Sequence, residues 1–580
     1  MADPILVLNR AFETAIAAAF GAEHASTDPA IRRSNHADYQ ANAAMALGKR
    51  VGRPPRDVAA AIVKELPLAG IAAKVEIAGP GFINITLEDA YVARELADTA
   101  RDARLGVAPA AKPETVVVDY SSPNVAKEMH VGHVRSTVIG DSLSRVLEAL
   151  GHKVIRQNHL GDWGTQFGML IEELIDIGEA GLAASMSDLD AFYKQARAKF
   201  DSDPAFAERS RQRVVLLQSG DETTLAHWRR LTGASKTYFA AVFERLGVKL
   251  RDEDICGESF YNPMLPGIVS ALEAQGLTTE SDGAICVFPE GFKSRVGSPL
   301  PVIVRKRDGG FGYAATDLAA IRHRSQTLQA TRNLYVVGAP QQQHLAMVWA
   351  VAKAAGWLVP PARAEHVAFG SILGADKKPF KTREGGTVKL AALLDEAIER
   401  AAAKIAEKNP KLDEATRNTL ARQLGIGAVK YCDLSSERIK DYVFDWDRML
   451  AFVGNTAPYL QYVHARASKL LRDATPEDAA AATAADISLG HPHERALAIE
   501  LLGFSEAVNT VADSLQPHRL CTYLFTIATK FNVFYDSPDC PILKSDDVAA
   551  RRSRLALTAL TRGILARGLD LLGIEAPPQM

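Results

Sequence analysis

Two histidines that lie three residues apart, His130 and His133, are the clearest candidates for chemistry in this sequence. They stand with Gly132 between a β-branched run, 115–120, and a segment with helical periodicity. Such a helix begins with unpaired N–H groups and the positive end of its dipole, which favour phosphate binding. Gly132 would let a ligand approach the backbone, and both imidazoles could donate to phosphate oxygens. The spacing alone also fits two histidines that only decorate a helix start.

Composition narrows the classes of protein that could use such a site. No G-x-x-x-x-G-K-[ST] stretch occurs, which excludes a P-loop. The five cysteines form no C-x-x-C pair, so spacing predicts neither a disulfide scaffold nor a metal site, and it predicts a reducing, cytoplasmic compartment. A chain of 580 residues, 47% hydrophobic and 23% charged, is typical of three or four globular domains without a membrane span. The net charge of −2 excludes a simple basic coat protein, although local patches could bind RNA.

The elements predicted around the histidines form a parallel α/β unit. The run 115–120 is typical of a buried strand, and 153–157 is the next strand. Between them, four apolar residues share one helical face: Ile139, Leu143, Val146 and Leu150. A strand–helix–strand order of this kind makes a right-handed crossover. Three further strands are predicted, over 301–304, 333–338 and 366–372.

The rest of the chain has different patterns. The first part, 1–110, is predicted to be α+β. Its helices are expected at the N-terminus and over 39–52, 54–66 and 90–104, and its strands over 74–78 and 82–86. A catalytic domain is predicted over 113–395, with a charged helical insertion at about 172–250. Connecting helices over 396–450 and a helical domain over 451–580 follow, with an inter-helix loop at 479–485.

The segment 121–133 resembles the HIGH signature of class I aminoacyl-tRNA synthetases, and its surroundings resemble the arginyl-tRNA synthetases. The matching segments follow one another along nearly the whole chain: 121–140, 158–168, 313–317, 341–344, 381–388, 455–462 and 571–577. One four-residue motif can occur by chance, but this ordered series is highly specific. The resemblance implies a Rossmann-type parallel-sheet catalytic domain, an α+β N-terminal domain and an all-α anticodon-binding bundle.

The same resemblance implies a reaction and its partners. ATP would activate L-arginine to arginyl-adenylate with release of pyrophosphate, and the arginyl group would pass to the 3′ end of tRNA(Arg). His130 and His133, beside Pro123, would contact the ATP phosphates and stabilise charge as the arginine carboxylate attacks. Mg²⁺ is expected with ATP, held mostly by phosphates and water. The usual form of the family is a monomer.

The second class I signature, K-M-S-K-S, is missing in plain form. The segment 379–383 stands in its place, with Thr382 where the second lysine would be. Many arginyl enzymes share this departure and carry a lysine just before HIGH, which is Lys127 here. Lys127 could therefore reach the same phosphates, with Lys381 or Lys378 as alternatives. Without the resemblance, Lys127 would be read as a solvated loop lysine.

A guanidinium substrate requires a planar carboxylate acceptor. The resemblance assigns Asp317 to it, with Tyr313 four residues earlier on the same helical face. Contacts to the rest of arginine are carried over onto Ser122, Asn124, His133 and Gln341. The pocket wall is predicted to include Asn158 and Asp162, which follow a parallel strand where open α/β sheets bind ligands. Core packing for Tyr313 and a polar surface run for Gln341 are the alternatives.

Two further regions are implied to contact tRNA. Phe82 and Asn84 match positions that hold a base of the tRNA elbow, although Phe82 could instead pack on its own helices. The anticodon is assigned to aromatic, amide and cationic groups of the C-terminal helices: Tyr459, Gln461, Tyr462, His464 and Arg466. Near the C-terminus, five arginines could add a positive field or form a solvated face: Arg551, Arg552, Arg554, Arg562 and Arg567.

Two rival interpretations remain at this point. Another class I synthetase or a related nucleotidylyltransferase would share the HIGH segment and the parallel sheet, but it should lack the Tyr313 and Asp317 pair. A tRNA-binding factor without catalysis is disfavoured by the intact His-x-Gly-His and by Lys127. Arginine-dependent ATP–pyrophosphate exchange in the presence of tRNA would separate these readings.

Overall fold

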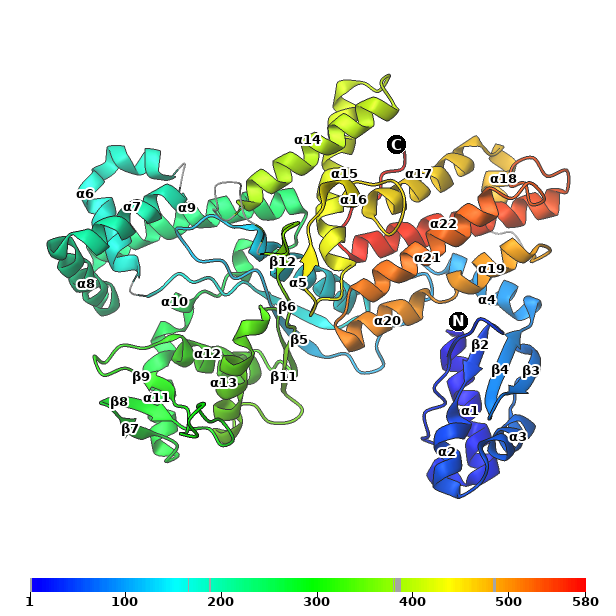
Figure 1. The fold of residues 1–580 in the computed structure, drawn as a ribbon, viewed down its shortest axis with the longest axis horizontal. Coiled ribbons are helices and arrows are strands. Elements are labelled where there is room, and N and C mark those ends of the chain that lie inside the picture. Colours follow the sequence, from blue (N-terminus) through cyan, green and yellow to red (C-terminus); the bar gives the residue numbers. More distant parts are fainter. Residues whose placement is uncertain (1–2, 165, 187–188, 379, 381–387, 483–486) are drawn as a thin grey trace. The chain divides into compact units, whose positions relative to one another are not determined.

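The computed structural model describes residues 3–164, 166–186, 189–378, 380, 388–482 and 487–580 (Figure 1). The chain divides into two compact units. One contains residues 1–108, 451–570 and 575–580, and the other contains 109–450 and 571–574. Among the described helices, none is long and apolar enough to span a membrane.

A four-stranded parallel sheet lies at the centre of the second unit. Its order is β11 (Arg363–His366), β10 (Arg332–Tyr335), β5 (Thr115–Asp119) and β6 (Lys153–Gln157), with every pair parallel. Helix α5 (Val131–Ala149) connects β5 to β6 and is buried along most of its length. Gly151 ends this connection with a left-handed φ of 83°, a conformation that suits glycine. The predicted strand–helix–strand unit is therefore confirmed.

Two of the predicted strands are placed differently from the expectation. The stretch predicted at 301–304 forms β9 (Val302–Arg305), which pairs antiparallel in a separate sheet with β8 (Ala284–Val287) and through it β7 (Thr279–Ser281). Its alternation of buried Val302 and Val304 with exposed Ile303 is typical of a strand with one wet face. The stretch predicted at 366–372 is split, because β11 ends at His366 and β12 (Ile372–Leu373) pairs with β13 (Tyr442–Val443).

Helices surround the sheet and extend from it. The predicted insertion is a group of four helices: α6 (Gln166–Met186), α7 (Leu189–Ser202), α8 (Pro204–Ser219) and α9 (Glu222–Leu246) (Figure 1). The remaining helices of the unit are α10 (Glu258–Tyr261), α11 (Leu265–Ala274), α12 (Tyr313–Arg322), α13 (Gln342–Ala354), α14 (Leu390–Lys408), α15 (Glu414–Leu434) and α16 (Trp446–Met449). Short 3-10 helices are η2 (Asp252–Asp254), η3 (Asn262–Met264) and η5 (Ala339–Gln341), and η4 (His323–Thr327) is a π-helical turn.

The first unit begins with the predicted α+β region. Its elements are α1 (Pro4–Phe20), η1 (Ala22–His24), β1 (Arg32–Arg33), β2 (Tyr39–Ala41), α2 (Ala43–Val51), α3 (Pro55–Glu65), β3 (Ala72–Ala78), β4 (Phe82–Leu87) and α4 (Asp89–Arg101). They form an antiparallel sheet in the order β1-β2-β4-β3. The helix predicted over 39–52 is wrong at its start, because the buried Tyr39 and Ala41 pair with β4.

The same unit ends in a helical array. It comprises α17 (Ala457–Asp473), α18 (Pro476–Ala481), α19 (Pro492–Leu501), α20 (Phe504–Ser514), α21 (His518–Tyr535) and α22 (Val548–Leu571). The loop predicted at 479–485 is wrong in its first part, since α18 continues to Ala481. Arg495 of α19 is paired with Asp38 at 2.8 Å and with Asp89 at 2.7 Å. The α+β region is therefore joined to the terminal helices by ion pairs of the half-buried Arg495 with the half-buried Asp38 and the exposed Asp89.

Candidate active site

The loop between β5 and α5 has a strained backbone. Ser121, Ser122 and Ala126 have φ angles of 72°, 47° and 61°, in the left-handed region that side chains disfavour. Hydrogen bonds hold each of them. Ser121 N–H donates to Ser136 Oγ at 2.9 Å, Ser122 N–H to Asn158 Oδ1 at 3.0 Å and Ala126 N–H to Ser235 Oγ at 3.0 Å. A strained loop persists only where its surroundings fix it, which is a feature of ligand sites.

The two histidines form a reciprocal cap on α5. The N–H of Gly132 donates to His130 Nδ1 at 3.0 Å, and the N–H of His130 donates to His133 Nδ1 at 3.0 Å. The N–H of Val131 donates to the carbonyl of Val388 at 2.9 Å. The expectation of unpaired backbone donors at this helix start is therefore wrong for these groups. A phosphate would instead meet the Nε2 edges of the imidazoles.

Electrostatics keep both imidazoles neutral. Burial lowers the pKa of His130, and the positive charge of Lys127 lowers it further. Burial and the neighbouring His130 lower the pKa of His133 to about 3. Because each Nδ1 accepts a backbone N–H, the ring proton belongs on Nε2. The rings lie 4.0 Å apart between centroids, so they present two adjacent donors.

Gly132 has a local structural role beside the predicted one. A Cβ at this position would lie 2.8 Å from His130 Cε1, closer than carbon atoms pack. The absence of a side chain at Gly132 therefore lets the His130 ring fold back onto the helix start.

Lys127 is the cation that the structure places beside this cap. Its ammonium lies 4.2 Å from the centroid of the Tyr193 ring, on α7 of the insertion. Lys381, the alternative to Lys127, lies outside the described residues, as does Thr382. Directly after them, Lys389 forms a backbone bridge with His130. The chain that follows the second signature is thus tied to the first.

Tyr313 and Asp317 meet at a third residue that the sequence analysis missed. Nε2 of His344, on α13, lies 2.6 Å from Asp317 Oδ2, and its ring lies 5.0 Å from that of Tyr313, edge to face. Tyr313 is 70% exposed, so core packing does not explain it. A pocket of about 440 Å³ adjoins Tyr313 and His344, with Lys306 and Met347 in its lining. Gln341 is exposed in η5, shortly after the carboxyl end of β10.

Glu258, at the start of α10, is a second residue that sequence reasoning missed. Burial raises its pKa to about 7, and the negative charges of Asp162 and Asp317 contribute. Asp162 is buried and accepts from Ser259 N–H at 2.8 Å and from Ser259 Oγ at 2.6 Å. Asp162 therefore holds the start of α10 in place. The carboxylates of Glu258 and Asp317 influence each other electrostatically, and a cationic side chain could use both. Nothing periodic marks Glu258 in the sequence.

The remaining predicted pocket residues support the loop in different ways. Asn158 is buried and its Oδ1 accepts from Ser122 N–H at 3.0 Å. Ser122 Oγ donates to Asp119 Oδ1 at 3.0 Å. Pro123 is buried, whereas Asn124 is exposed and its backbone bridges to Gly161. Asn158 thus acts on the loop, and the Asn124 side chain lies over Gly161, where a Cβ would meet its Oδ1 at 2.1 Å.

Phe82 and Asn84 share the more accessible face of β4, because Ile83 and Ile85 fill the opposite, buried face. Packing on its own helices therefore does not explain Phe82. Asn84 Oδ1 accepts from Gln40 Nε2 at 2.8 Å, which adds Gln40 to this face.

The residues predicted on α17 are divided between its two faces. Tyr462 is exposed, and Arg466 stacks on it at 4.9 Å and on Tyr535 of α21 at 4.4 Å. Tyr459 OH accepts from Asn532 Nδ2 at 2.9 Å, so this aromatic and cationic cluster spans two helices.

Two predicted anticodon contacts are wrong. Gln461 is fully buried and donates to the carbonyl of Glu575 at 2.8 Å. His464 is buried with its Nδ1 2.9 Å from the carbonyl of Pro577. These side chains secure the C-terminal segment instead of facing outward.

The positive field expected near the C-terminus is largely neutralised by ion pairs. Arg551 and Arg552 both pair with Asp478, at 2.7 and 2.9 Å, and Arg554 pairs with Glu494 at 2.6 Å. Arg567 pairs with Asp570 at 2.6 Å. Arg562 is exposed.

Three family models match consecutive parts of the chain. Residues 6–87 match the arginyl tRNA synthetase N terminal domain, 98–446 match the class I (R) tRNA synthetase catalytic domain, and 460–580 match the DALR anticodon binding domain. The chain is 54% identical to arginine–tRNA ligase of Thermobifida fusca, with 100% of both chains covered. It is 50% identical to the ligase of Erwinia tasmaniensis, with 96% of each covered.

Solved structures agree with these matches. The arginyl-tRNA synthetase of Plasmodium falciparum superposes with a TM-score of 0.86 at 28% identity, over 100% of both chains. That of Thermus thermophilus superposes with a TM-score of 0.82 at 26% identity, over 99% of this chain and 100% of the other.

Proposed function

The chain belongs to the arginyl-tRNA synthetases, and from that membership we propose which residues carry its reaction. The enzyme is an arginine–tRNA ligase that uses ATP, L-arginine and tRNA(Arg). In the first step an arginine carboxylate oxygen attacks the α-phosphorus of ATP, and pyrophosphate leaves as the bond to the bridging oxygen breaks. In the second, a terminal ribose hydroxyl of the tRNA attacks the arginyl carbonyl carbon, and AMP leaves.

For the first step, His130 and His133 donate from Nε2 to the phosphates, with Pro123 beside them. The observation that carries this assignment is the reciprocal cap, in which each Nδ1 already accepts a backbone N–H. Lys127 supplies the positive charge that offsets charge developing on the transferring phosphate. These donors are imidazole and ammonium groups, not the oxygen ligands that Mg²⁺ prefers. Mg²⁺ is therefore held by ATP phosphates and water.

Arginine recognition rests on the carboxylates of Asp317 and Glu258. A guanidinium placed beside them gains charge-assisted hydrogen bonds and offsets the burial and the negative charges of Asp162 and Asp317, which together raise the pKa of Glu258. Tyr313 covers the planar group, and His344 orients the Asp317 carboxylate. Ser122, Asn124, His133 and Gln341 contact the α-amino and carboxylate end of arginine or the stem of its side chain.

Recognition of tRNA rests on two surfaces of the first unit. Phe82 and Asn84 bind an unstacked base of the elbow, and Tyr459 and Tyr462 bind the anticodon. We assign the domains as 1–110, 113–395, 396–450 and 451–580. The five cysteines are free thiols, which fits a cytoplasmic enzyme, and the family resemblance favours a monomer.

Arginine-dependent ATP–pyrophosphate exchange with tRNA present tests these assignments. Asp317→Asn should lower kcat/KM for arginine by on the order of 30-fold or more, with little change in the KM for ATP, because an amide keeps the size and loses the charge-assisted acceptor. Lys127→Ala should lower kcat by about 10²–10³ with a smaller effect on the KM for ATP. Near-normal exchange by either variant would remove that residue from its assigned role.

A further inference from the structure

The helical insertion contacts the phosphate-binding loop at two successive residues. The N–H of Ala126 donates to Ser235 Oγ of α9, and Ser235 is fully buried. At the next residue, the Lys127 ammonium lies 4.2 Å from the centroid of the Tyr193 ring on α7. The loop that supplies the candidate catalytic cation is therefore held from the insertion, not only from the sheet.

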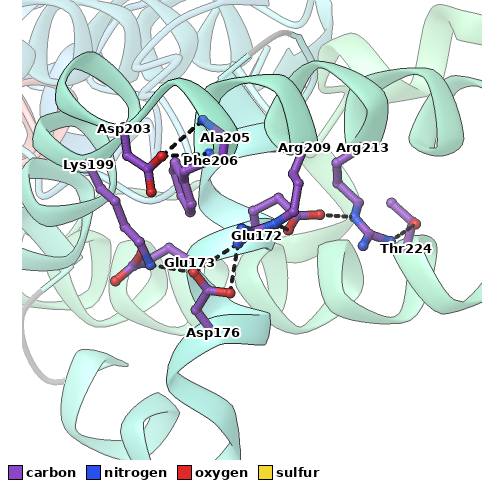
Figure 2. A network of polar contacts seen from close by, with 10 residues as sticks. All are labelled: Glu172, Glu173, Asp176, Lys199, Asp203, Ala205, Phe206, Arg209, Arg213 and Thr224. Atoms are coloured by element: carbon purple, nitrogen blue, oxygen red, sulfur yellow. Dashed lines mark hydrogen bonds and ion pairs between the residues drawn. The ribbon is translucent and has the colours of Figure 1, made fainter.

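Helix α7 is fixed by a network of polar contacts among the insertion helices (Figure 2). Six residues after Tyr193, Lys199 reaches Glu173 of α6 at 3.1 Å and also pairs with Asp176. Gln195 donates to Glu173 at 2.8 Å. Glu173 is almost fully buried, and loss of partners for a buried carboxylate is costly. The register of α7 against α6 is thus strongly specified, and with it the place of the Tyr193 ring.

The same network continues to the other insertion helices. Arg209 of α8 reaches Glu172 at 3.0 Å and Asp176 at 2.8 Å. Arg213 reaches Glu172 at 2.6 Å and Thr224 of α9 at 3.0 Å (Figure 2). The insertion helices α7 and α9, which contact the loop through Tyr193 and Ser235, therefore belong to one polar framework.

We propose that Tyr193 is a positioning residue for adenylate formation, because its ring holds the Lys127 ammonium beside the histidine cap. This inference rests on the proposed role of Lys127. A lysine has a long flexible stem, so orienting it in advance saves conformational entropy at the moment of reaction. An aromatic face attracts the ammonium without using its N–H donors and without cancelling its charge. A carboxylate partner would occupy the N–H donors and cancel the charge, so the ammonium would stabilise the phosphates less.

The test compares three variants on the same helix in single-turnover adenylate formation with tRNA and arginine. Tyr193→Leu should lower the rate by on the order of five-fold, the size of one exposed cation–π contact. The KM for arginine should stay unchanged. Tyr193→Phe keeps the ring face and should retain the rate. The control is Phe200→Leu, since Phe200 makes its own cation–π contacts, with Arg197 and Arg211, away from the loop. It should leave the rate unchanged.

The same substitution in a Lys127→Ala background separates the possible outcomes. If the ring acts through Lys127, Tyr193→Leu should cause no further loss there. An equal loss in both backgrounds, or an equal loss in Phe200→Leu, would overturn the inference in favour of a role in folding. If Lys127→Ala is impaired while Tyr193→Leu is not, the inference fails and the role of Lys127 stands. If Lys127→Ala keeps its rate, the proposed role of Lys127 is wrong, and the inference about Tyr193 that rests on it is wrong as well.

Discussion

Arg324 and Asp119 form an ion pair shielded from solvent, with Nη2 2.7 Å from Oδ2. Arg324 belongs to η4, the turn that continues α12, and Asp119 ends β5. The other oxygen of Asp119 accepts from Ser122 Oγ. The pair therefore joins the helix that carries Tyr313 and Asp317, proposed to bind arginine, to the loop proposed to bind ATP.

Replacing Arg324 with methionine should destabilise the enzyme by about 3–5 kcal/mol, because Asp119 would remain buried without its partner. Urea unfolding followed by intrinsic fluorescence measures this. The matched control is Arg567→Met, which breaks the exposed pair with Asp570 and should cost less than about 1 kcal/mol. Equal midpoints for the two variants would contradict the importance of burial.

Two substitutions of His130 separate capping from phosphate binding. Asparagine can still accept the Gly132 N–H but offers no donor at the Nε2 position, so kcat for adenylate formation should fall by about 10²-fold with normal stability. Glutamine reaches the Nε2 position but caps poorly, so it should lose stability, by about 1 kcal/mol, and retain more activity. Stopped-flow kinetics and thermal unfolding report the two effects. The opposite ranking of the variants would show that the cap, not the donor, matters for catalysis.

The affinity for arginine should depend on pH through Glu258. Its pKa of about 7 in the free enzyme means that the carboxyl is mostly protonated below that value. Since guanidinium binding favours the ionised form, the proton must leave, and affinity should fall by up to tenfold per pH unit below 7. Above 7 the affinity should level off. The measurement is the arginine KM between pH 5.5 and 8.5, and Glu258→Gln should flatten the profile. A wild-type profile without this slope would remove Glu258 from the pocket.

Phe82→Ala should weaken tRNA binding by about tenfold, as loss of one base–aromatic stack predicts. The control is Thr86→Ala, on the same face of β4 two positions beyond Asn84, which should have little effect. Filter binding at fixed salt gives the affinities, and the KM values for ATP and arginine should not change. A Phe82→Ala variant that binds tRNA as tightly as the wild type would show that this face does not touch RNA.

Local periodicity and β-branched runs were sufficient to predict β5, α5 and β6, because a buried parallel strand and an amphipathic helix leave strong local signals. The strand β2 was missed because its three residues, Tyr39–Ala41, are separated from the helix that begins at Ala43 by Asn42 alone, with no glycine or proline between them. Long-range contacts leave no such signal. The pairing of Arg495 with Asp38 and Asp89 spans more than 400 positions.

The candidate site divides in the same way. His130, His133, Tyr313 and Asp317 lie in short segments that resemble family motifs, so the resemblance could assign them. Glu258 and His344 were not assigned, because only folding brings them to Asp317. Gln461 was misassigned, because its burial depends on a C-terminal segment more than 100 residues away.

The reciprocal cap on α5 has a consequence for repeated turnover. Each imidazole accepts a backbone N–H at Nδ1 and carries its own hydrogen at Nε2. The hydrogen-bond donors that the helix start presents are therefore ring N–H groups in place of backbone N–H groups. The helix end is then complete whether or not nucleotide is present. In the proposed reaction, these backbone groups keep their partners when pyrophosphate departs, and only the contacts proposed at Nε2 change. The empty enzyme therefore starts the next cycle without having to rebuild its helix end.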